Sequence, residues 1–410
     1  MTQDNKILDL TEDVKWIGVL DPDIRVFDIV MHTEDGSTYN SYFINAEKKA
    51  VIELAKEKFS ETYLSKLRRV TDLDKIDYII FDHTEPDHSG CMRELVDLAQ
   101  QAVVVGSGNA IRYLTDIVNK PFKSMVVKDG DTLDLGNKTL KFISAPNLHW
   151  PDTIFTYLEQ ERILFTCDSF GAHFCHREMF DDKVGDYNAS FRYYFDVILK
   201  PYSRFMLKAI EKISSLDISM IAPGHGPILR TNWKGIVDQT KELAEEYVAL
   251  TAGTGEKRVL IAYVSAYGYT EDMARLIAGG ASEVDNVVAE VMDIETADIG
   301  EIDSKLTIAD GIIIGSPTIN QNTLLPVYRM AAMVSPLRDK GKLAGSFGSY
   351  GWSGEAPRLI AEMLKNLKLK IFEEPAAFKF APEKEKENAL RDYGKRFAQQ
   401  LMAESNKEKE

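Results

Sequence analysis

Hydrophobic residues follow two different rhythms along the chain, and the change comes near residue 250. Before that point, short apolar runs predict strands at residues 24–30, 38–44, 78–81, 102–105, 139–143, 153–158 and 163–166. Stretches with apolar residues on one helical face predict helices at 55–70, 92–98, 202–213 and 236–250. This mixture predicts sheets that are covered on the outside by helices.

After residue 257, predicted strands and helices alternate regularly. The strands fall at 259–264, 287–292, 312–314 and 343–347, and the helices at 270–278, near 302, at 327–334 and at 356–367. Apolar, β-branched strands with helices between them are typical of a parallel sheet that is covered on both faces. Such a doubly wound sheet binds its ligands at the C-terminal ends of its strands, so we expect binding loops there.

A small, polar segment at residues 251–257 separates the two rhythms and is predicted to be a linker. The 410 residues exceed what one compact core usually accommodates, which favours two domains. We therefore expect a first domain at 1–250, a second at 258–403 and a polar tail at 404–410.

Composition narrows the classes of function. The formal net charge of −15, with no stripe of Lys and Arg, disfavours a nucleic acid as the main partner. No apolar stretch approaches the roughly 18 residues of a membrane helix, and the polar N-terminus lacks a signal-like apolar region, so we expect a cytoplasmic protein with no membrane partner. Its three cysteines form no C-x-x-C pair, which excludes a disulfide framework and a four-cysteine metal site within the chain.

The most informative local motif follows the predicted strand at 78–81. His83, Glu85, Asp87 and His88 place two imidazoles and two carboxylates within six residues. A loop that contains Pro86 can aim alternate side chains at one point, as metal ligation requires. The segment therefore predicts a metal site.

Three further residues follow apolar, strand-like runs: His149, Asp168 and His225. Taken singly, each is as well explained as an ordinary turn residue. Together with the four residues of the first motif they make seven ligands, which suffice for two metal ions if one carboxylate bridges them. Asp168 is the natural bridge.

Three loops of the second half are candidates for binding a phosphate and a planar ring, because each follows a predicted strand. Helix N-termini with exposed amides bind anions, and the first loop precedes such a terminus. Tyr350 and Trp352 of the third loop are placed to stack on a ring, and glycines let backbone amides approach its polar edge. The candidate residues are Ser265, Tyr267, Gly268, Tyr269, Thr270, Ser316, Pro317, Thr318, Ile319, Asn320, Ser349, Tyr350, Gly351, Trp352, Ser353 and Gly354. By contrast, the incomplete G-x-G-x-x-G at 106–111 is interpreted as a strand-to-helix turn.

The first motif and the later His, Asp and His resemble the metallo-β-lactamase superfamily, whose fold is an αββα sandwich. Glu85 stands where zinc hydrolases of that superfamily carry a second His, and a site richer in anionic oxygen suits iron better than zinc. With the flavodoxin-like half that follows, nearly the whole chain resembles the flavodiiron proteins. The resemblance implies two domains, a metallo-β-lactamase-like αββα sandwich followed by a flavodoxin-like doubly wound parallel sheet.

The same resemblance implies FMN in the three loops and two non-haem irons in the first domain. His83, Glu85, His149 and Asp168 would hold one iron, and Asp87, His88, Asp168 and His225 the other. In parts of the family the residue at the position of His88 is displaced from the metal. His173 and Tyr194 are candidates for hydrogen bonding to a bound gas, although a packing role is the favoured interpretation, and His32 and His176 are interpreted as structural.

The implied activity is reduction of O2 to water, of NO to N2O, or of both, as a defence against oxidative or nitrosative stress. Two ferrous ions and one flavin hydroquinone hold the four electrons that convert O2 to two waters. Electrons would come from a separate partner, with rubredoxin the first candidate and a deazaflavin or an NAD(P)H-dependent reductase as alternatives. The resemblance also implies a head-to-tail homodimer or a dimer of dimers.

Two other functions stay open at this point. A zinc hydrolase fused to a flavodoxin domain would be indicated if Glu85 were not a ligand and thioester or lactam hydrolysis were found. An electron carrier with a vestigial metal site would be indicated if the chain retained no iron on anaerobic purification.

Overall fold

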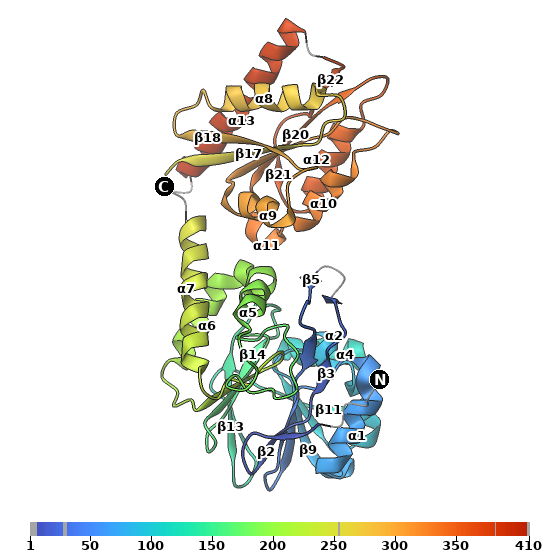
Figure 1. Ribbon diagram of the computed structural model, residues 1–410, viewed down its shortest axis with the longest axis vertical. Coiled ribbons are helices and arrows are strands. Elements are labelled where there is room, and N and C mark those ends of the chain that lie inside the picture. The colour runs from blue at the N-terminus through green and yellow to red at the C-terminus, as the bar shows by residue number, and fades with distance from the viewer. Residues whose placement is uncertain (1–5, 28–30, 253–254, 382, 408–410) are drawn as a thin grey trace. The chain divides into compact units, whose positions relative to one another are not determined.

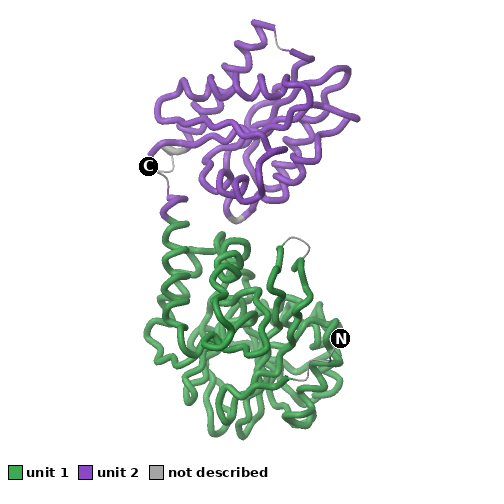
Figure 2. The backbone as a smooth tube through the Cα atoms, viewed as in Figure 1, with its two compact units in different colours: residues 1–248 green, residues 249–410 purple. Residues whose placement is uncertain are grey.

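The computed structural model describes residues 6–27, 31–252, 255–381 and 383–407. The chain divides into two compact units, residues 1–248 and 249–410 (Figure 2). Among the described residues, no helix is both long enough and apolar enough to cross a membrane.

Unit 1 contains two large sheets flanked by helices (Figure 1). Its strands are β1 (Leu8–Asp9), β2 (Val14–Trp16), β3 (Val19–Asp21), β4 (Val26–Phe27), β5 (Met31–His32), β6 (Ser37–Tyr39), β7 (Tyr42–Ile44), β8 (Lys49–Ile52), β9 (Ile76–Ile80), β10 (Val103–Gly106), β11 (Lys123–Val126), β12 (Thr132–Asp134), β13 (Thr139–Ser144), β14 (Ile154–Leu158), β15 (Ile163–Cys167) and β16 (Met220–Pro223). Besides the two large sheets, unit 1 has the pairs β3 with β6 and β4 with β5. Its helices are η1 (Glu57–Phe59), α1 (Ser60–Val70), η2 (Leu73–Lys75), α2 (Pro86–Ser89), α3 (Met92–Leu98), α4 (Gly108–Val118), α5 (Asn188–Tyr194), the π-helical η3 (Phe195–Leu199), η4 (Lys200–Tyr202), α6 (Ser203–Ile213) and α7 (Trp233–Thr251).

The two large sheets of unit 1 stack face to face around an apolar core. Successive residues of each strand point to opposite sides of its sheet, so only every second residue faces this core. The seven-stranded sheet has the order β1-β2-β7-β8-β9-β10-β11, and the five-stranded sheet runs from β12 to β16 in sequence order. On β9, Ile80 joins the core between the sheets, where Phe142 and Phe165 of the second sheet also lie. Ile79, its neighbour in sequence, faces the helices outside.

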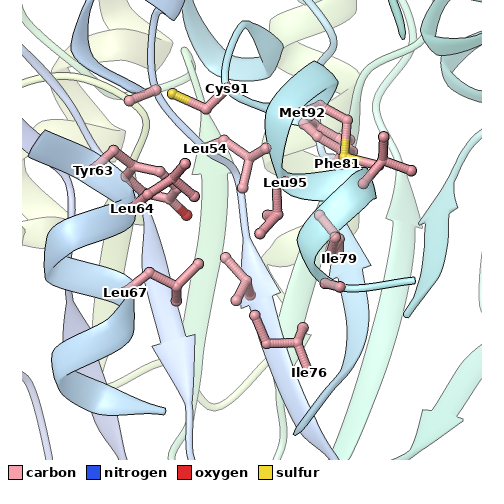
Figure 3. Close-up of a cluster of buried hydrophobic side chains, with 14 of the residues drawn as sticks. Leu54, Tyr63, Leu64, Leu67, Ile76, Ile79, Phe81, Cys91, Met92 and Leu95 are labelled. Atoms are coloured by element: carbon pink, nitrogen blue, oxygen red, sulfur yellow. The ribbon is translucent and has the colours of Figure 1, made fainter. Parts of the chain in front are cut away.

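Helices cover both outer faces of this sandwich. Figure 3 shows the cluster on the first sheet, where Leu64 and Leu67 of α1 and Leu95 of α3 meet Ile76 and Ile79 of β9. On the second sheet, a separate apolar cluster joins β13 to β16 with α5, α6 and α7. The αββα sandwich expected from the sequence is therefore confirmed.

Several predicted elements of unit 1 differ from the structure. The strand expected at 38–44 is two strands, β6 and β7, because Asn40 between them donates its side-chain N–H groups to the carbonyls of Pro223 and Gly226. The helix expected from residue 55 begins as η1 and continues as α1 from Ser60. The strand expected at 24–30 is limited to β4, and residues 28–30 lie outside the described residues.

Unit 2 alternates strands and helices. Its elements are β17 (Lys257–Tyr263), α8 (Tyr269–Ala281), β18 (Val287–Asp293), α9 (Ile299–Ile308), β19 (Gly311–Gly315), α10 (Leu325–Met333), α11 (Pro336–Asp339), β20 (Leu343–Tyr350), α12 (Ala356–Asn366), β21 (Lys370–Ile371), β22 (Ala376–Lys379) and α13 (Lys384–Lys407). Helix α13 and the short strands β21 and β22 were not predicted from the sequence, whereas the other strands agree with it to within a few residues.

The sheet of unit 2 has the order β18-β17-β19-β20-β21, with β22 also paired to β20, and all of its pairs are parallel. Helices α8 and α13 cover one face, and α9, α10 and α12 cover the other (Figure 1). The doubly wound sheet is thereby confirmed. The strand order reverses at β17, so the loops after β17, β19 and β20 meet at one edge of the sheet.

Candidate metal centre and flavin loops

The loop after β9 carries the four residues of the first motif. Its start is held by Glu53, whose Oε1 accepts hydrogen bonds from the backbone N–H groups of Asp82 at 2.7 Å and His83 at 2.9 Å. Pro86 then occupies the start of α2, where its missing N–H costs nothing. The single helical turn of α2 brings Asp87 and His88 back toward His83.

The remaining candidates come from the second sheet. His149 lies in the loop between β13 and β14, Asp168 follows β15, and His225 follows β16. Because β15 and β16 are parallel neighbours, Asp168 and His225 leave the sheet at the same edge. All seven predicted ligands come together in unit 1, and only Glu85 and His149 among them retain partial exposure.

Two groups of ligand atoms meet at Asp168. His83, Glu85, His149 and Asp168 offer atoms within 4.8 Å of one another, and so do Asp87, His88 and His225. Asp168 Oδ2 lies 3.6 Å from His83 Nε2 and 3.4 Å from His149 Nε2. Its Oδ1 lies 3.1 Å from His88 Nε2 and 3.5 Å from His225 Nε2. Each carboxylate oxygen thus faces a different group, as a bridging ligand would.

The donor set fits cations. Within the described part of the chain, both carboxylate oxygens of Asp87 and the Oδ2 of Asp168 are buried with no hydrogen-bond partner. Burial raises the pKa of Asp168, but the imidazoles of His88 and His149 outweigh it and hold that pKa well below its ordinary value. Burial lowers the pKa of His149, but Asp168 and Glu85 raise it to about 9. The carboxylates therefore require positive charge between them, which two metal ions would supply.

Hydrogen bonds on the far side of the rings orient two of the imidazoles. His225 Nδ1 donates to the carbonyl oxygen of Thr38 at 2.5 Å, and a carbonyl can only accept. His83 Nδ1 lies 3.2 Å from both carboxylate oxygens of Asp152, and the Oδ2 of that carboxylate also accepts from the Thr84 N–H and hydroxyl. With the proton on Nδ1, each Nε2 presents its lone pair to the ligand cluster.

A small pocket adjoins the ligands and offers about 20 Å³ to the centre of a water-sized molecule. Phe27, Met31 and Ile198 line it together with five of the candidate ligands, His173 and Tyr194. Tyr194 donates its hydroxyl to Asp168 Oδ1 at 3.1 Å. Burial, and next the charge of Asp168, raise the pKa of Tyr194 well above its ordinary value, so the hydroxyl keeps its proton at neutral pH.

His173 faces the same pocket. Its Nδ1 lies 2.8 Å from the Ser37 hydroxyl, and its buried Nε2 has no hydrogen-bond partner among the described residues. Burial, followed by the neighbouring His225, lowers the pKa of His173 to about 3. The ring is therefore neutral at physiological pH, in contrast to the imidazoles that face carboxylates.

In unit 2, the first flavin loop joins β17 to α8. Gly268 has φ +86°, a left-handed conformation that favours glycine, and its N–H donates to Ser265 Oγ at 3.1 Å. The turn exposes the first N–H groups of α8, a helix long enough to bind an anion at this end. Thr270 is buried and exchanges a hydrogen bond of 2.9 Å with Ser349 of the third loop, which ties the two loops together.

The other two loops use most of their hydroxyl groups internally. Ser316 Oγ accepts from the Leu324 N–H, and Thr318 Oγ1 accepts from the Ala356 N–H. In the described chain, Ser353 Oγ is buried without a hydrogen-bond partner, so it remains available to a ligand. The remaining predicted residues lie in the same loops, and Tyr267 and Trp352 expose 83% and 81% of their surface, which leaves both rings open for stacking.

Two family models match the chain. The model described as ODP family beta lactamase covers residues 38–226, and the flavodoxin model covers residues 261–393. A type A flavoprotein of Rhodobacter capsulatus is 39% identical over 95% of this chain and 90% of the relative. A flavo-diiron protein of Clostridium acetobutylicum is 38% identical over 96% of this chain and 99% of the relative.

This chain belongs to the flavodiiron protein family. Solved structures agree with that assignment. The flavodiiron protein from Giardia intestinalis matches with a TM-score of 0.64 and 29% identity over 98% of each chain. The rubredoxin oxygen:oxidoreductase from Desulfovibrio gigas matches with a TM-score of 0.68 and 28% identity over 97% of this chain and 99% of the other.

The family is one of oxidoreductases that carry FMN in a flavodoxin domain and a non-haem diiron site. Both cofactors fit this flavodiiron protein. The seven-residue cluster supplies three carboxylates and four imidazoles, a hard and anionic set that suits iron. The loops of unit 2 supply the helix N-terminus and the exposed rings that a flavin phosphate and ring system need.

Sequence patterns missed the residues behind the ligands. Asp152 and Glu53 each contact the His83 segment, although they lie 69 and 30 residues away from His83 in the chain. No local motif marks such long-range contacts. His32 and His176 lie outside the ligand cluster, and the segment at 106–111 forms the start of α4, where Ser107 Oγ accepts from the Ala110 N–H.

Proposed function

We propose that this flavodiiron protein reduces O2 to water, NO to N2O, or both, at a diiron site that receives electrons from FMN, in defence against oxidative or nitrosative stress. The observation that carries the proposal is the position of Asp168, whose two oxygens face two separate groups of ligand atoms. A bridging carboxylate at this position would hold two irons side by side, as reaction with one small molecule requires.

The size of the adjoining pocket supports a gaseous substrate. It offers about 20 Å³, and a single bound water needs roughly 10–15 Å³ by the same measure. A space on this scale suits a small molecule such as O2 or NO.

When bound, the two irons and the FMN supply the electrons, four for converting O2 and four protons to two waters, or two for converting two NO and two protons to N2O and water. The chain's own residues would shape and polarise the site. Tyr194 holds its proton at the hydroxyl and donates to Asp168 Oδ1, which orients the bridge. His173 presents a neutral ring at the pocket wall, and Phe27 and Ile198 exclude bulk water.

The electrons would come from a separate redox partner. Rubredoxin is the first candidate, because a structural neighbour is named rubredoxin oxygen:oxidoreductase. A deazaflavin or a separate NAD(P)H-dependent reductase are the alternatives. We further expect a cytoplasmic homodimer or dimer of dimers, in which the flavin of one chain serves the irons of another.

Gas consumption tests the proposal directly. Protein loaded with iron and FMN is reduced anaerobically and mixed in separate experiments with O2 and with NO, while peroxide and N2O are measured. Rapid loss of one gas or both, with little peroxide, is expected, and the ratio of rates identifies the preferred substrate. Iron-free protein that retains FMN is the control. Loaded protein that consumes neither gas, or zinc-loaded protein that hydrolyses a lactam or thioester, would contradict the proposal.

A variant pair tests the pocket residues. Removing the Tyr194 hydroxyl with Tyr194→Phe takes away the hydrogen bond to Asp168, so we expect turnover to fall by roughly 10- to 100-fold. Tyr193→Phe removes the hydroxyl of the adjacent, partly exposed tyrosine and is the matched control. Equal rates in the two variants would assign Tyr194 to packing alone.

A further inference from the structure

A second group of buried side chains lies behind the ligand cluster. Glu53, His88 and Cys167 offer atoms within 4.8 Å of one another, and all three residues are buried. Of these, only His88 belongs to the predicted ligands. Glu53 and Cys167 have no part in the function proposed above, so their position against His88 calls for a physical explanation.

The backbone holds Glu53 in an unusual conformation. Its φ is +54°, in the left-handed region that residues with a side chain seldom adopt. Three hydrogen bonds fix the segment: the Glu53 N–H donates to the Ile80 carbonyl, the Ser41 hydroxyl donates to the Glu53 carbonyl, and the Leu54 N–H donates to the His88 carbonyl. Such strain persists only where surrounding contacts impose it, and it is frequent at functional sites.

The two carboxylate oxygens of Glu53 differ in their contacts. Oε1 accepts from the N–H groups of Asp82 and His83 and so holds the start of the metal-binding loop. Oε2 is buried and receives no hydrogen bond from any residue that the structure describes. Buried carboxylate oxygens are normally hydrogen-bonded, so Oε2 calls for a donor.

The two ring nitrogens of His88 also differ in their contacts. Its Nε2 faces the ligand cluster, 3.1 Å from Asp168 Oδ1 and 3.5 Å from Asp87 Oδ2. Its Nδ1 is buried and, within the described ranges of the chain, has no hydrogen-bond partner. Gly224 restricts the ring from another side, since a Cβ at that position would lie 2.8 Å from His88 Cε1.

The other imidazoles show what His88 requires. His83 Nδ1 has the Asp152 carboxylate, and His225 Nδ1 has the Thr38 carbonyl. A histidine that binds a metal through one nitrogen almost always donates the other N–H to an acceptor of this kind. Glu53 offers such an acceptor, because its Oε2 is buried without a hydrogen-bond partner among the described residues and its carboxylate and the His88 ring have ligand atoms within 4.8 Å of each other.

We propose that Glu53 is a positioning residue, whose Oε2 accepts the Nδ1–H of His88 and thereby directs the His88 Nε2 lone pair at the iron held with Asp87 and His225. The inference rests on the diiron site proposed above. Through its two oxygens, Glu53 links the loop that starts at His83 to the ring of His88. One buried carboxylate then sets the geometry of ligands for both irons.

Cys167 lies near the same two side chains but is a poor substitute for the carboxylate. Its thiol is buried and free of any disulfide. A neutral thiol is only a weak acceptor. The contact between the imidazole and the carboxylate therefore dominates.

Glu53→Gln separates the two tasks of the residue. The amide oxygen can take the place of Oε1 and keep both backbone hydrogen bonds, which leaves the NH2 group facing His88. Since two donors cannot pair, His88 must then carry its proton on Nε2, and that nitrogen can no longer bind iron. The opposite amide orientation would set the NH2 group against two backbone N–H donors, so it is disfavoured.

The experiment compares 57Fe-reconstituted, FMN-loaded proteins by iron content and Mössbauer spectroscopy. His88→Ala supplies the spectrum of a site that lacks this ligand. Glu53→Gln is expected to retain a native circular dichroism spectrum and to reproduce the His88→Ala change at one iron, with that iron bound roughly 10- to 100-fold more weakly. Tyr63→Phe is the matched control, because it removes a buried hydroxyl that bonds to Ser41 near Glu53 and leaves the carboxylate in place.

The outcomes distinguish a failure of the proposed diiron function from a failure of the proposed role of Glu53. Wild-type protein that fails to take up two irons would contradict the proposed function. Wild-type protein with two irons, combined with a Glu53→Gln variant whose two iron signals are unchanged, would overturn only the role of Glu53. If Glu53→Gln does not fold, a crystal structure of the iron-loaded wild type decides the matter. A separation of about 3.2 Å or less between His88 Nδ1 and Glu53 Oε2 supports the proposal, and a water or another acceptor at Nδ1 contradicts it.

Discussion

The two cofactor sites of this protein are built in different ways. In unit 1, buried imidazoles and carboxylates from four separate loops converge, and several of their polar atoms are left without hydrogen bonds by the described residues. In unit 2, the flavin loops satisfy most of their own hydroxyl groups and present a helix N-terminus and exposed rings. The metal site therefore depends on individual side chains, whereas the flavin site depends on the shape of three turns.

This difference predicts unequal sensitivity to substitution. Removal of one ligand in unit 1 leaves other buried charges uncompensated, which is costly. Removal of one side chain in unit 2 leaves the turns and the sheet edge in place. The following predictions test that contrast, beginning with the largest expected effect.

Asp168→Asn is expected to have the largest effect, because it removes the one carboxylate that faces both groups of ligands. We expect nearly complete loss of iron and of gas reduction, with FMN still bound at one per chain. Metal analysis and flavin absorbance measure both quantities. Asp217→Asn, which alters an exposed aspartate of the same unit, is the control. Retention of two irons by Asp168→Asn would show that Asp168 is not the bridge.

Removal of iron by chelation is expected to destabilise unit 1 selectively. Ligand binding to the native state stabilises it by about 3–4 kcal/mol when free ligand exceeds Kd by roughly 100- to 1,000-fold. The thermal transition of unit 1 should therefore move to lower temperature, while flavin release, which reports on unit 2, should occur at the same temperature as before. Calorimetry with FMN fluorescence measures the two events. Equal shifts in both would contradict the contrast between the units.

Asp152→Asn is expected to weaken iron binding by roughly 10- to 100-fold. Its Oδ2 accepts from the Thr84 N–H and hydroxyl, so an asparagine would keep its oxygen there and place its NH2 group at the position of Oδ1, 3.2 Å from His83 Nδ1. That change disfavours the tautomer of His83 that binds metal. Competition with a calibrated chelator measures the affinity. Asp129→Asn, at an exposed position of the same unit, should bind iron as the wild type does.

Trp352→Ala is expected to have the smallest effect. The ring is 81% exposed without ligand, and stacking between aromatic rings contributes about 0.5–1.5 kcal/mol. The Kd for FMN should rise by roughly 2- to 13-fold, with iron content unchanged. Fluorescence titration of the apoprotein measures it, and Trp352→Phe should restore most of the affinity. A complete loss of FMN would show that the flavin site is as fragile as the metal site.

Much of this architecture was accessible from the sequence, because periodicity reports directly on burial. The alternation of strands and helices after residue 257 predicted the doubly wound sheet, and the apolar runs before residue 167 located β9, β10, β13, β14 and β15. The motif from His83 to His88 predicted a metal site, since few other arrangements place so many ligand types so close together. The structure places all seven predicted residues in one cluster, and their ligation to iron stays a prediction.

What the sequence could not supply depends on contacts between distant segments. Helix α13 is strongly polar along its length, so its buried stripe, which includes Tyr393 and Phe397, was not recognised. No sequence pattern marked Glu53, and only the folded chain places its carboxylate beside His83 and His88. Residues that support a site leave no local pattern, because their partners lie far away in the chain.

The most direct test of the account is an anaerobic reductive titration of protein whose iron and FMN have been counted. If two irons and a flavin act together, each chain should contain about two irons and one FMN and should take up four electrons. One O2 should then reoxidise each chain fully without release of peroxide. Zinc in the place of iron, or uptake of only the two electrons of the flavin, would contradict the central claim that two metals and a flavin act together.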